Sequence, residues 1–238
     1  MLLRDHPLMR YRGLPNWAPA SLWIKAIKQK INSLIGNAVV WPSIQTELGD
    51  YKVYFKGNVL NAGSGGDDIS ELITGRIYNQ DIVKWNENVH FVSPLNKIPV
   101  EDGFFDAIIC NAVLEHVENP VEIIRELSRV LKSGGYLYLC IPFMQPEHKA
   151  PADYQRYTID GIQKLVTDQS FEVVTAEGVH TVYHTLGWIV QNWLEAKKNP
   201  TYILLRISLI PLLRYKTKHS RTYVHSLASA YRVLAKKP

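Results

Sequence analysis

The sequence is poor in cysteine and has no long apolar segment. Its two cysteines, Cys110 and Cys140, are too few for a disulfide framework or a four-ligand zinc site, and both lie in apolar runs typical of strands. We therefore expect buried, reduced thiols. The most apolar stretch near the C-terminus, residues 202–213, is interrupted by Arg206 and Pro211 and falls short of the roughly 20 residues that cross a bilayer. It can lie on a membrane but not span one.

A signal peptide and an even charge distribution are also missing. Residues 1–12 carry charged and histidine side chains where a signal peptide needs an apolar stretch, so we expect a cytoplasmic location. The net charge is +5 for residues 1–56, −9 for residues 57–189 and +9 for residues 190–238. The basic tail is compatible with a solvated face or with attraction to a phosphate-rich surface such as anionic lipid or nucleic acid.

Short apolar runs alternate with turns and helices beyond residue 57. The predicted strands are residues 59–62, 76–79, 89–92, 105–110, 136–141, 171–176 and 231–235. Two predicted helices have clear starts, one at Asn119-Pro120 that runs to the Gly134-Gly135 turn and one capped by Thr158. Continuous apolarity in the fourth and fifth strands is typical of a parallel sheet covered on both faces. The pattern predicts a doubly wound α/β fold.

The predicted strands and helices divide the chain into four parts. Residues 1–56 form an N-terminal arm with an amphipathic helix that Ser21 caps and Gly36 ends. Residues 57–178 are the α/β core, and residues 179–224 are a mostly helical, basic insertion or cap. Residues 225–238 hold the final strand, which we expect at an edge of the sheet.

A glycine-rich loop, residues 63–66, follows the first predicted strand. Glycines there allow positive φ and let a ligand approach the backbone at the carboxyl end of a parallel strand. Asp81 ends the next strand, where a carboxylate can accept hydrogen bonds from both hydroxyls of a ribose, although capping a helix from Ile82 is equally compatible. Asp68 replaces the third glycine of a dinucleotide motif, which disfavours NAD and FAD, and a P-loop is excluded.

A third motif makes the combination of motifs specific. Residues 104–117 read F-F-D-A-I-I-C-N-A-V-L-E-H-V, and residues 129–135 read R-V-L-K-S-G-G. Together with the glycine loop and Asp81, they resemble class I S-adenosylmethionine-dependent methyltransferases, in particular the small-molecule, type 11-like branch. The resemblance covers roughly residues 57–178. It implies a Rossmann-like fold with a mostly parallel seven-stranded sheet and S-adenosyl-L-methionine as the cofactor.

The resemblance also implies the cofactor contacts. The glycine loop surrounds the methionine part of the cofactor, Asp81 holds the ribose, and the residues after the third and fourth strands lie beside the adenine and the methionine. In this sequence, the residues that the resemblance implies as cofactor contacts are Asn61, Gly63, Ser64, Gly65, Asp81, Ile82, Leu95, Asn96, Asn111 and Ala112. Asn61, Asp67 and Pro94 depart from the family pattern. The span before Asp81 is also too short for the usual first helix.

A second cluster of polar residues follows the fifth predicted strand. Residues 148–158 resemble the H-x-x-P-x-D-Y-x-R-Y/F-T segment of bacterial methyltransferases often found in surface glycan biosynthesis. Such a segment borders the acceptor pocket in that fold. The candidate bases, in order, are His148, His116 and Asp153, and the candidate substrate-binding residues are Tyr154, Arg156 and Tyr157. Alternatively, Asp153 and Arg156 form a salt bridge that fixes the loop; we expect His148 to face the pocket and Arg156 to be structural.

No metal site is predicted, because Glu115, His116, His148 and Asp153 lie in different segments without helix-borne ligand spacing. Nucleic-acid bases are disfavoured as substrates, because N-A-V-L replaces the (N/D/S)-P-P-(Y/F) motif of base methylases. Residues 188–221 combine aromatic, aliphatic and basic side chains, which is compatible with core packing or with a peripheral membrane contact.

The sequence therefore predicts methyl transfer to a small or lipid-linked acceptor, with a hydroxyl of a glycan or related metabolite as the first choice. One alternative is a quinone or lipid methyltransferase. The other is a non-catalytic cofactor-binding scaffold with a basic interaction tail, supported by the departures at Asn61, Asp67 and Pro94.

Overall fold

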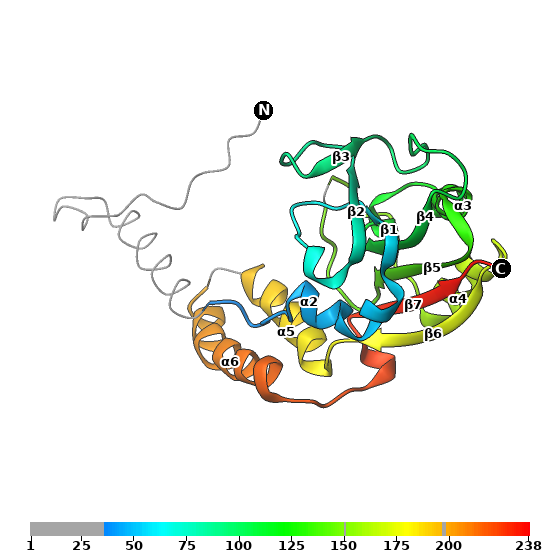
Figure 1. The fold of residues 1–238 in the computed structure, drawn as a ribbon. Helices are drawn as coiled ribbons and strands as arrows, with labels where there is room; N and C mark the ends of the chain where they lie inside the picture. The colour runs from blue at the N-terminus through cyan, green and yellow to red at the C-terminus, as the bar shows by residue number, and fades with distance from the viewer. Residues whose placement is uncertain (1–35, 150, 197–198) are drawn as a thin grey trace, which may run out of the picture.

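The computed structural model describes residues 36–149, 151–196 and 199–238, so the predicted helix over residues 21–35 and the arm before it lie outside the described residues. The described chain forms one seven-stranded sheet with helices on both faces (Figure 1). The strands are β1 (Lys56–Ala62), β2 (Thr74–Asp81), β3 (Val89–Val92), β4 (Phe105–Asn111), β5 (Leu131–Pro142), β6 (Glu172–Val179) and β7 (Ala230–Lys236).

The strand order is β3-β2-β1-β4-β5-β7-β6, with β1 to β5 parallel and β7 antiparallel to both of its neighbours. This confirms the predicted doubly wound, mostly parallel sheet. The predicted edge position of the last strand is wrong, because β7 lies between β5 and β6. Tyr231, Val233 and Leu234 show the reason: they are buried on opposite faces of the sheet, whereas β6 is only half-buried and forms the edge.

The helices begin where the capping residues predict. The longer helices are α3 (Pro120–Val130), α4 (Ile159–Thr167), α5 (Val182–Glu195) and α6 (Pro200–His219). Asn119 caps α3 by accepting a hydrogen bond from the Glu122 backbone N–H at 3.3 Å, and Thr158 caps α4 in the same way. However, α3 ends at Val130, before the Gly134-Gly135 turn, because β5 begins at Leu131 with an irregular segment in which Gly134 adopts a φ of +79°.

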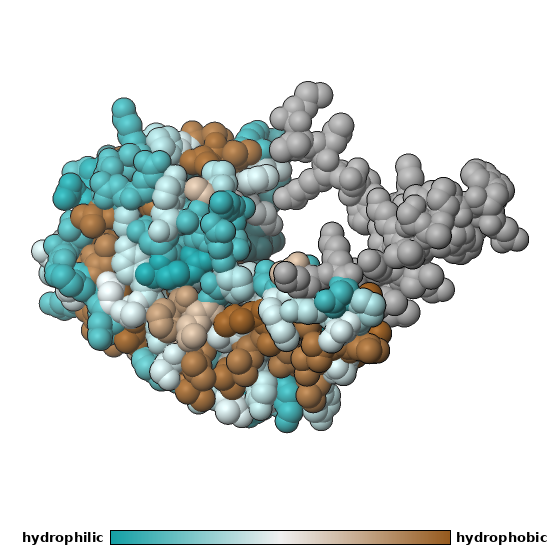
Figure 2. All heavy atoms as spheres, turned by 180° about the vertical axis from the view of Figure 1, so that it is seen from behind, coloured by the Kyte–Doolittle hydropathy of each residue, from teal (hydrophilic) through white to brown (hydrophobic). Residues whose placement is uncertain are grey.

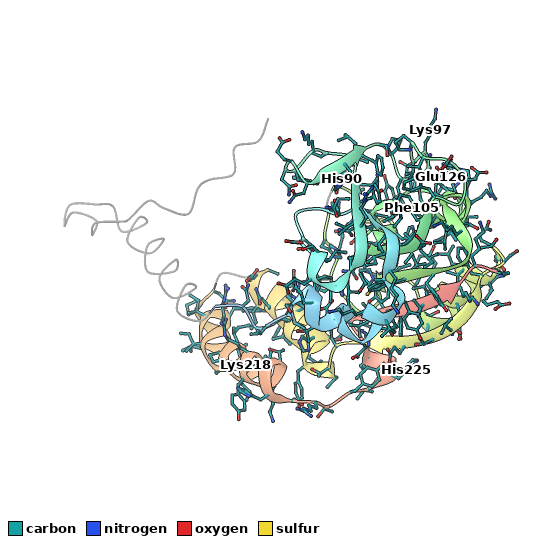
Figure 3. The ribbon with its side chains drawn as sticks, viewed as in Figure 1. His90, Lys97, Phe105, Glu126, Lys218 and His225 are labelled. Carbon is teal, nitrogen blue, oxygen red and sulfur yellow. The ribbon has the colours of Figure 1, made fainter. Side chains whose placement is uncertain are left out.

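Each face of the sheet has its own core. On one face, α3 and α4 cover alternate residues of the strands, including the fully buried Phe105 of β4 (Figure 3). The other face is covered by α2 (Ile44–Leu48) and the 3₁₀ helix η1 (Gly49–Tyr54), both of which precede β1. The connection from β1 to β2 holds only the 3₁₀ helix η2 (Ser70–Leu72), as its shortness predicted.

The insertion between β6 and β7 is helical, as predicted. Helices α5 and α6 pack on each other and on Ala38 and Val39, which form a third small core apart from the sheet. α6 continues through Pro211, and its exposed Lys218 lies in the last turn (Figure 3). Within the described ranges, no helix has the length and apolarity needed to cross a membrane. Cys110 and Cys140 are free and buried, as expected, and burial raises the pKa of both thiols.

Candidate functional site

The glycine loop lies at the carboxyl end of β1, where the strand order reverses between β1 and β4. Gly63 has a φ of +66°, and a Cβ added there would lie 2.5 Å from a Val113 methyl carbon. Only glycine therefore fits this position. Gly65 also has positive φ, and its backbone N–H donates to Asp81 Oδ2 at 2.8 Å. This bond ties the loop to the end of β2.

Asp81 is 8% exposed at the end of β2, beside the glycine loop. Its Oδ1 accepts a hydrogen bond from the Val83 N–H at 3.2 Å, while Oδ2 accepts from Gly65. No helix begins at Ile82 in the described chain, so the helix-cap alternative is wrong. Each carboxylate oxygen keeps acceptor capacity for a ribose hydroxyl. Ile82 is 61% exposed next to this carboxylate and offers an apolar surface to a base.

Three polar side-chain atoms in this region are buried without a hydrogen-bond partner among the described residues: Ser64 Oγ, Ser93 Oγ and Asn111 Oδ1. Buried polar atoms are normally paired, and an orphaned set beside a ligand-ready loop is an expected feature of a site for a polar ligand. Ser93 follows β3, and its backbone N–H donates to the Asp81 carbonyl at 3.0 Å. The residues present therefore fit a nucleoside-bearing cofactor, and Ser93 joins the candidate site residues although it was not predicted from the sequence.

The other residues that the resemblance implies as cofactor contacts differ in burial, in backbone conformation and in the partners of their side chains. Asn61 donates from Nδ2 to Asn79 Oδ1 at 3.0 Å, so its amide links β1 to β2 where the family has an acid. Leu95 is buried, while the exposed Asn96 side chain donates from Nδ2 to Glu122 Oε1 at 3.0 Å and keeps its Oδ1 as an acceptor. Ala112 adopts a φ of +54° directly after β4, a strained conformation for a residue with a Cβ.

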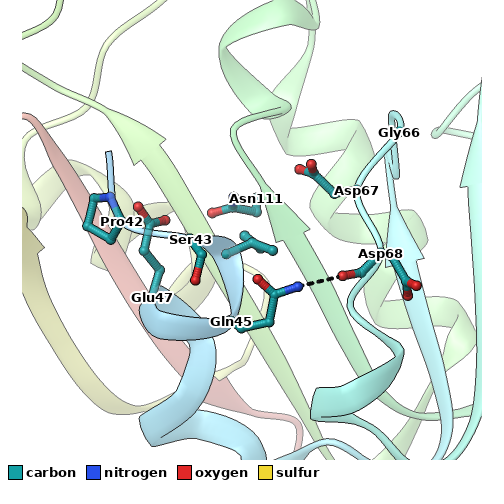
Figure 4. Close-up of a pocket in the computed structure, with 9 residues that line it drawn as sticks. Pro42, Ser43, Gln45, Glu47, Gly66, Asp67, Asp68 and Asn111 are labelled. Atoms are coloured by element: carbon teal, nitrogen blue, oxygen red, sulfur yellow. Dashed lines mark hydrogen bonds between the residues drawn. The ribbon is translucent and has the colours of Figure 1, made fainter. Parts of the chain in front are cut away.

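A cleft of about 530 Å³ lies between α2 and the glycine loop (Figure 4). Its lining residues are Pro42, Ser43, Ile44, Gln45, Glu47, Gly66, Asp67, Asp68 and Asn111. Gln45 donates from Nε2 to the Asp68 carbonyl at 2.9 Å and so joins the N-terminal segment to the loop (Figure 4). The contribution of residues 42–47 was not predicted, because the segment carries no motif and reaches the site only through tertiary packing.

Two histidines and a carboxylate meet where β4 and β5 end. Glu115, in the 3₁₀ helix η3 (Leu114–His116), is fully buried, and its Oε1 lies 3.7 Å from His116 Nε2 and 3.6 Å from His148 Nε2. The two imidazole rings meet edge to face at 5.2 Å. The Glu115 carboxylate raises the pKa of His148 above its ordinary value, an effect that burial of the ring opposes. Glu115 was not predicted as a site residue.

The loop that carries His148 is fixed by an ion pair. Arg156 pairs with Asp153, whose side chain is 2% exposed and whose Oδ2 also accepts from the His148 backbone N–H at 2.8 Å. The guanidinium holds the pKa of Asp153 well below its usual range. A carboxylate with such a low pKa is a weak base, and its oxygens are already bonded to Arg156 and His148, which argues against Asp153, the third candidate base. The pair is the salt bridge that we gave as the alternative.

The side chains of the two tyrosines of this segment have partners other than the histidines. Tyr157 is half-buried and packs against the core under α3 and α4, and burial raises its pKa. Tyr154 is 51% exposed and donates to Glu118 Oε1 at 3.0 Å. An unpredicted neighbour is Trp188 of α5, whose ring lies 5.5 Å from the His148 ring. The helical insertion therefore reaches the histidine cluster.

Part of the chain is similar in sequence to known methyltransferases. Residues 61–139 match the family model described as a methyltransferase domain. The ubiquinone biosynthesis O-methyltransferase of Dechloromonas aromatica is 34% identical over 98 residues, which are 34% of this chain and 42% of that protein. The chain thus spans less than half the length of this relative.

Solved structures share the fold. Phosphoethanolamine N-methyltransferase 2 of Haemonchus contortus, in complex with S-adenosyl-L-methionine, has a TM-score of 0.54 and 13% identity over 87% of this chain and 56% of that chain. The (4+2)-cyclase SpnF has a TM-score of 0.55 and 16% identity over 92% of this chain and 95% of that chain. Sequence identities this low show only that the proteins share a fold. Because one of these proteins is a cyclase, the fold alone does not determine the reaction.

Proposed function

Because this chain carries a class I S-adenosylmethionine-dependent methyltransferase domain of the type 11-like branch, we propose that it transfers a methyl group from S-adenosylmethionine to a hydroxyl oxygen of an acceptor. The observation that supports this most is the joint arrangement at the ends of β1 and β2. There, the Asp81 carboxylate is bonded to the Gly65 backbone, and the buried Ser64 hydroxyl has no partner in the described chain.

The chain's own residues have separate tasks in this proposal. The left-handed Gly63 and Gly65 shape a loop that a ligand can approach closely, and Asp81 accepts hydrogen bonds from the two ribose hydroxyls. Ser93 and the backbone near Leu95 lie where the nucleoside base is expected. Asn111, which lines the cleft, and the neighbouring Ala112 are the residues expected to border the reacting end. Bound S-adenosylmethionine supplies an already activated methyl group, so the protein contributes mainly positioning and exclusion of water.

The acceptor hydroxyl must lose its proton as the new bond forms. His148 is the candidate base, because its partly exposed ring lies beside the buried Glu115 carboxylate, which stabilises a proton on the imidazole. His116 is the second candidate. Asp153 and Arg156 act as positioning residues, because they hold the His148 backbone through the 2.8 Å bond to Asp153 Oδ2.

Two acceptor classes follow from different observations. The resemblance of residues 148–158 to enzymes of surface glycan biosynthesis supports a glycan hydroxyl. The relative named ubiquinone biosynthesis O-methyltransferase instead supports a phenolic hydroxyl on a ring with an isoprenoid tail.

A lipid-linked acceptor is supported by the outer face of the insertion, because Trp193, Leu204 and Ile207 are 48%, 69% and 47% exposed there. Apolar atoms form a band along the lower edge of the molecule, where Figure 1 places α5 and α6 (Figure 2). Exposed apolar side chains with neighbouring arginines and lysines are typical of surfaces that contact anionic membranes. A peripheral membrane contact through residues 188–221 therefore remains part of the proposal.

The test is a transfer assay with methyl-labelled S-adenosylmethionine and three probes: an alkyl glycoside, a catechol with a short isoprenoid chain, and phosphoethanolamine as an amine. We expect label on an oxygen of the glycoside or the catechol, at a rate reduced at least tenfold in His148→Gln, consistent with loss of a general base. Label on the amine alone would contradict O-methylation. Tight cofactor binding without transfer to any probe would favour the scaffold alternative.

A further inference from the structure

We propose that Glu115, His116 and His148 form a binding site for a single divalent transition-metal ion of the zinc type. One ligand atom from each of these residues lies within 4.8 Å of the other two. The sequence predicted no metal site because the three residues lack ligand spacing on one helix. The fold removes that objection, because η3 follows β4 and His148 follows β5, and parallel neighbouring strands end at the same edge of the sheet.

The distances suit such an ion after the side chains adjust. Zinc binds imidazole nitrogen and carboxylate oxygen at about 2.0–2.2 Å, which in a tetrahedral site places the ligand atoms roughly 3.4 Å apart. Glu115 Oε1 lies 3.6 Å from His148 Nε2 and 3.7 Å from His116 Nε2. The two carboxylate distances need to close by a few tenths of an ångström, and the distance between the two histidine ligand atoms, at most 4.8 Å, by up to about 1.4 Å, which rotation of the partly exposed imidazoles can supply.

The outer nitrogens of both imidazoles are engaged in the manner of metal ligands. His116 Nδ1 lies 2.5 Å from the Ala152 carbonyl, and His148 Nδ1 lies 3.2 Å from the Pro146 carbonyl. A carbonyl oxygen only accepts, so in a metal-bound state each Nδ1 would donate to its carbonyl and each Nε2 would present a lone pair. Arg156 Nη2 also lies 3.4 Å from His148 Nδ1, so this state requires the carbonyl to be the partner of His148 Nδ1. Metal-binding histidines usually donate their second N–H to a carbonyl or carboxylate in this way. Both lone pairs face the same carboxylate.

The buried Glu115 carboxylate is an independent reason to expect a bound cation. The residue is fully buried, and neither of its oxygens has a hydrogen-bond partner within the described residues. A buried, unpaired carboxylate is costly unless a proton, a cationic side chain or a metal ion compensates it. The Arg156 guanidinium, which lies 3.4 Å from His148 Nδ1, is paired with Asp153 rather than with Glu115. A divalent ion held by the carboxylate and the two imidazoles would supply the missing compensation.

The surroundings leave one side of the cluster open. The side chains of His116 and His148 are 16% and 29% exposed, and three protein ligands with an open position are typical of catalytic rather than structural zinc sites. The binding of an ion does not depend on the proposed function, but its catalytic consequence does. A hydroxyl that occupied the open position would become more acidic. The ion, rather than His148, would then make its deprotonation possible.

The test measures metal binding without cofactor or acceptor. Tag-free protein, freed of metal by a chelator, is titrated with Co²⁺ and then Zn²⁺, and binding is followed by visible absorption and by equilibrium dialysis with elemental analysis. We expect one equivalent of Co²⁺ with the strong visible bands of a low-coordinate site, displaced by Zn²⁺. Glu115→Gln and His148→Gln should each weaken binding by about 100-fold or more, because each removes a direct ligand.

The control is His219→Gln, which removes an exposed histidine from the end of α6 and should bind metal like the wild type. Far-UV circular dichroism and S-adenosylmethionine binding show that each variant is folded. Folded wild-type protein that binds no Co²⁺ or Zn²⁺ would overturn the proposal. So would binding that survives both ligand substitutions, since the ion would then lie elsewhere. Either result would leave the methyl-transfer proposal standing.

Discussion

His184 should make the stability of this protein fall steeply below pH 6.5. The side chain is 4% exposed on α5, and burial, followed by the charge of His180, lowers its pKa from 6.5 to about 4; Glu47 and backbone contacts oppose the shift. The unfolded chain binds a proton at His184 below pH 6.5, whereas the folded protein does so only near pH 4. The stabilisation is therefore complete above pH 6.5 and is lost as the pH falls through 4.

The size of the effect follows from the shift. A difference of about 2.5 pKa units corresponds to roughly 3 kcal/mol in full, of which about 2 kcal/mol should be lost between pH 8 and pH 5. The ring bonds to Thr181 Oγ1 at 2.8 Å and to the Val40 carbonyl at 3.2 Å, and it stacks on His180 at 5.2 Å. The hydrogen bonds to Val40 and Thr181 oppose the lowered pKa of His184, but burial and the charge of His180 outweigh them.

The assay is urea unfolding at pH 8 and pH 5, followed by tryptophan fluorescence, for the wild type, His184→Gln and the exposed control His225→Gln. The wild type and the control should lose about 2 kcal/mol more between the two pH values than His184→Gln. Glutamine keeps a donor for the Val40 carbonyl but does not titrate. Equal pH dependence in the wild type and His184→Gln would refute the reasoning.

Further predictions concern the site and the surface. Gly63→Ala should lower the unfolding free energy by about 1–2 kcal/mol and weaken cofactor binding, because the left-handed conformation opposes a Cβ; Gly49→Ala, with open space around its Cα and outside the site, should do neither in the same denaturation and calorimetry. Asp153→Asn should destabilise the protein by about 2–4 kcal/mol in urea unfolding, because it breaks a partly buried ion pair. Leu204→Asp should abolish flotation with anionic vesicles, and Val53→Asp, equally exposed on the core, should not; no flotation of the wild type would end the membrane hypothesis.

The sequence predicted the elements that depend on local signals. Continuous apolar runs indicated the strands, and Asn119 and Thr158 marked the starts of α3 and α4, because these signals act within a few residues. The position of β7 could not be predicted in this way. An apolar run shows that a strand is buried, but its neighbours in the sheet depend on pairing with distant residues, here Tyr136 through Pro142 and β6.

The candidate site likewise has residues that local signals predict and residues that they do not. The glycine loop and Asp81 are adjacent to strand ends, so their meeting follows from the order of parallel strands. Glu115 was not predicted because its importance comes from the distant His148 and from complete burial, neither of which appears in a local motif. Trp188 was interpreted as a surface or core residue, although the packing of α5 brings its ring beside His148.

The most direct test of the central claim is calorimetric titration of S-adenosylmethionine into the wild type, Asp81→Asn and the remote surface control Asp168→Asn. We predict that the wild type and the control bind alike, and that Asp81→Asn binds about 1–3 kcal/mol more weakly, because the ribose hydroxyls lose a charged acceptor. Equal binding by all three proteins would show that the cofactor does not use Asp81. Absence of binding by folded wild-type protein would contradict the assignment of the site.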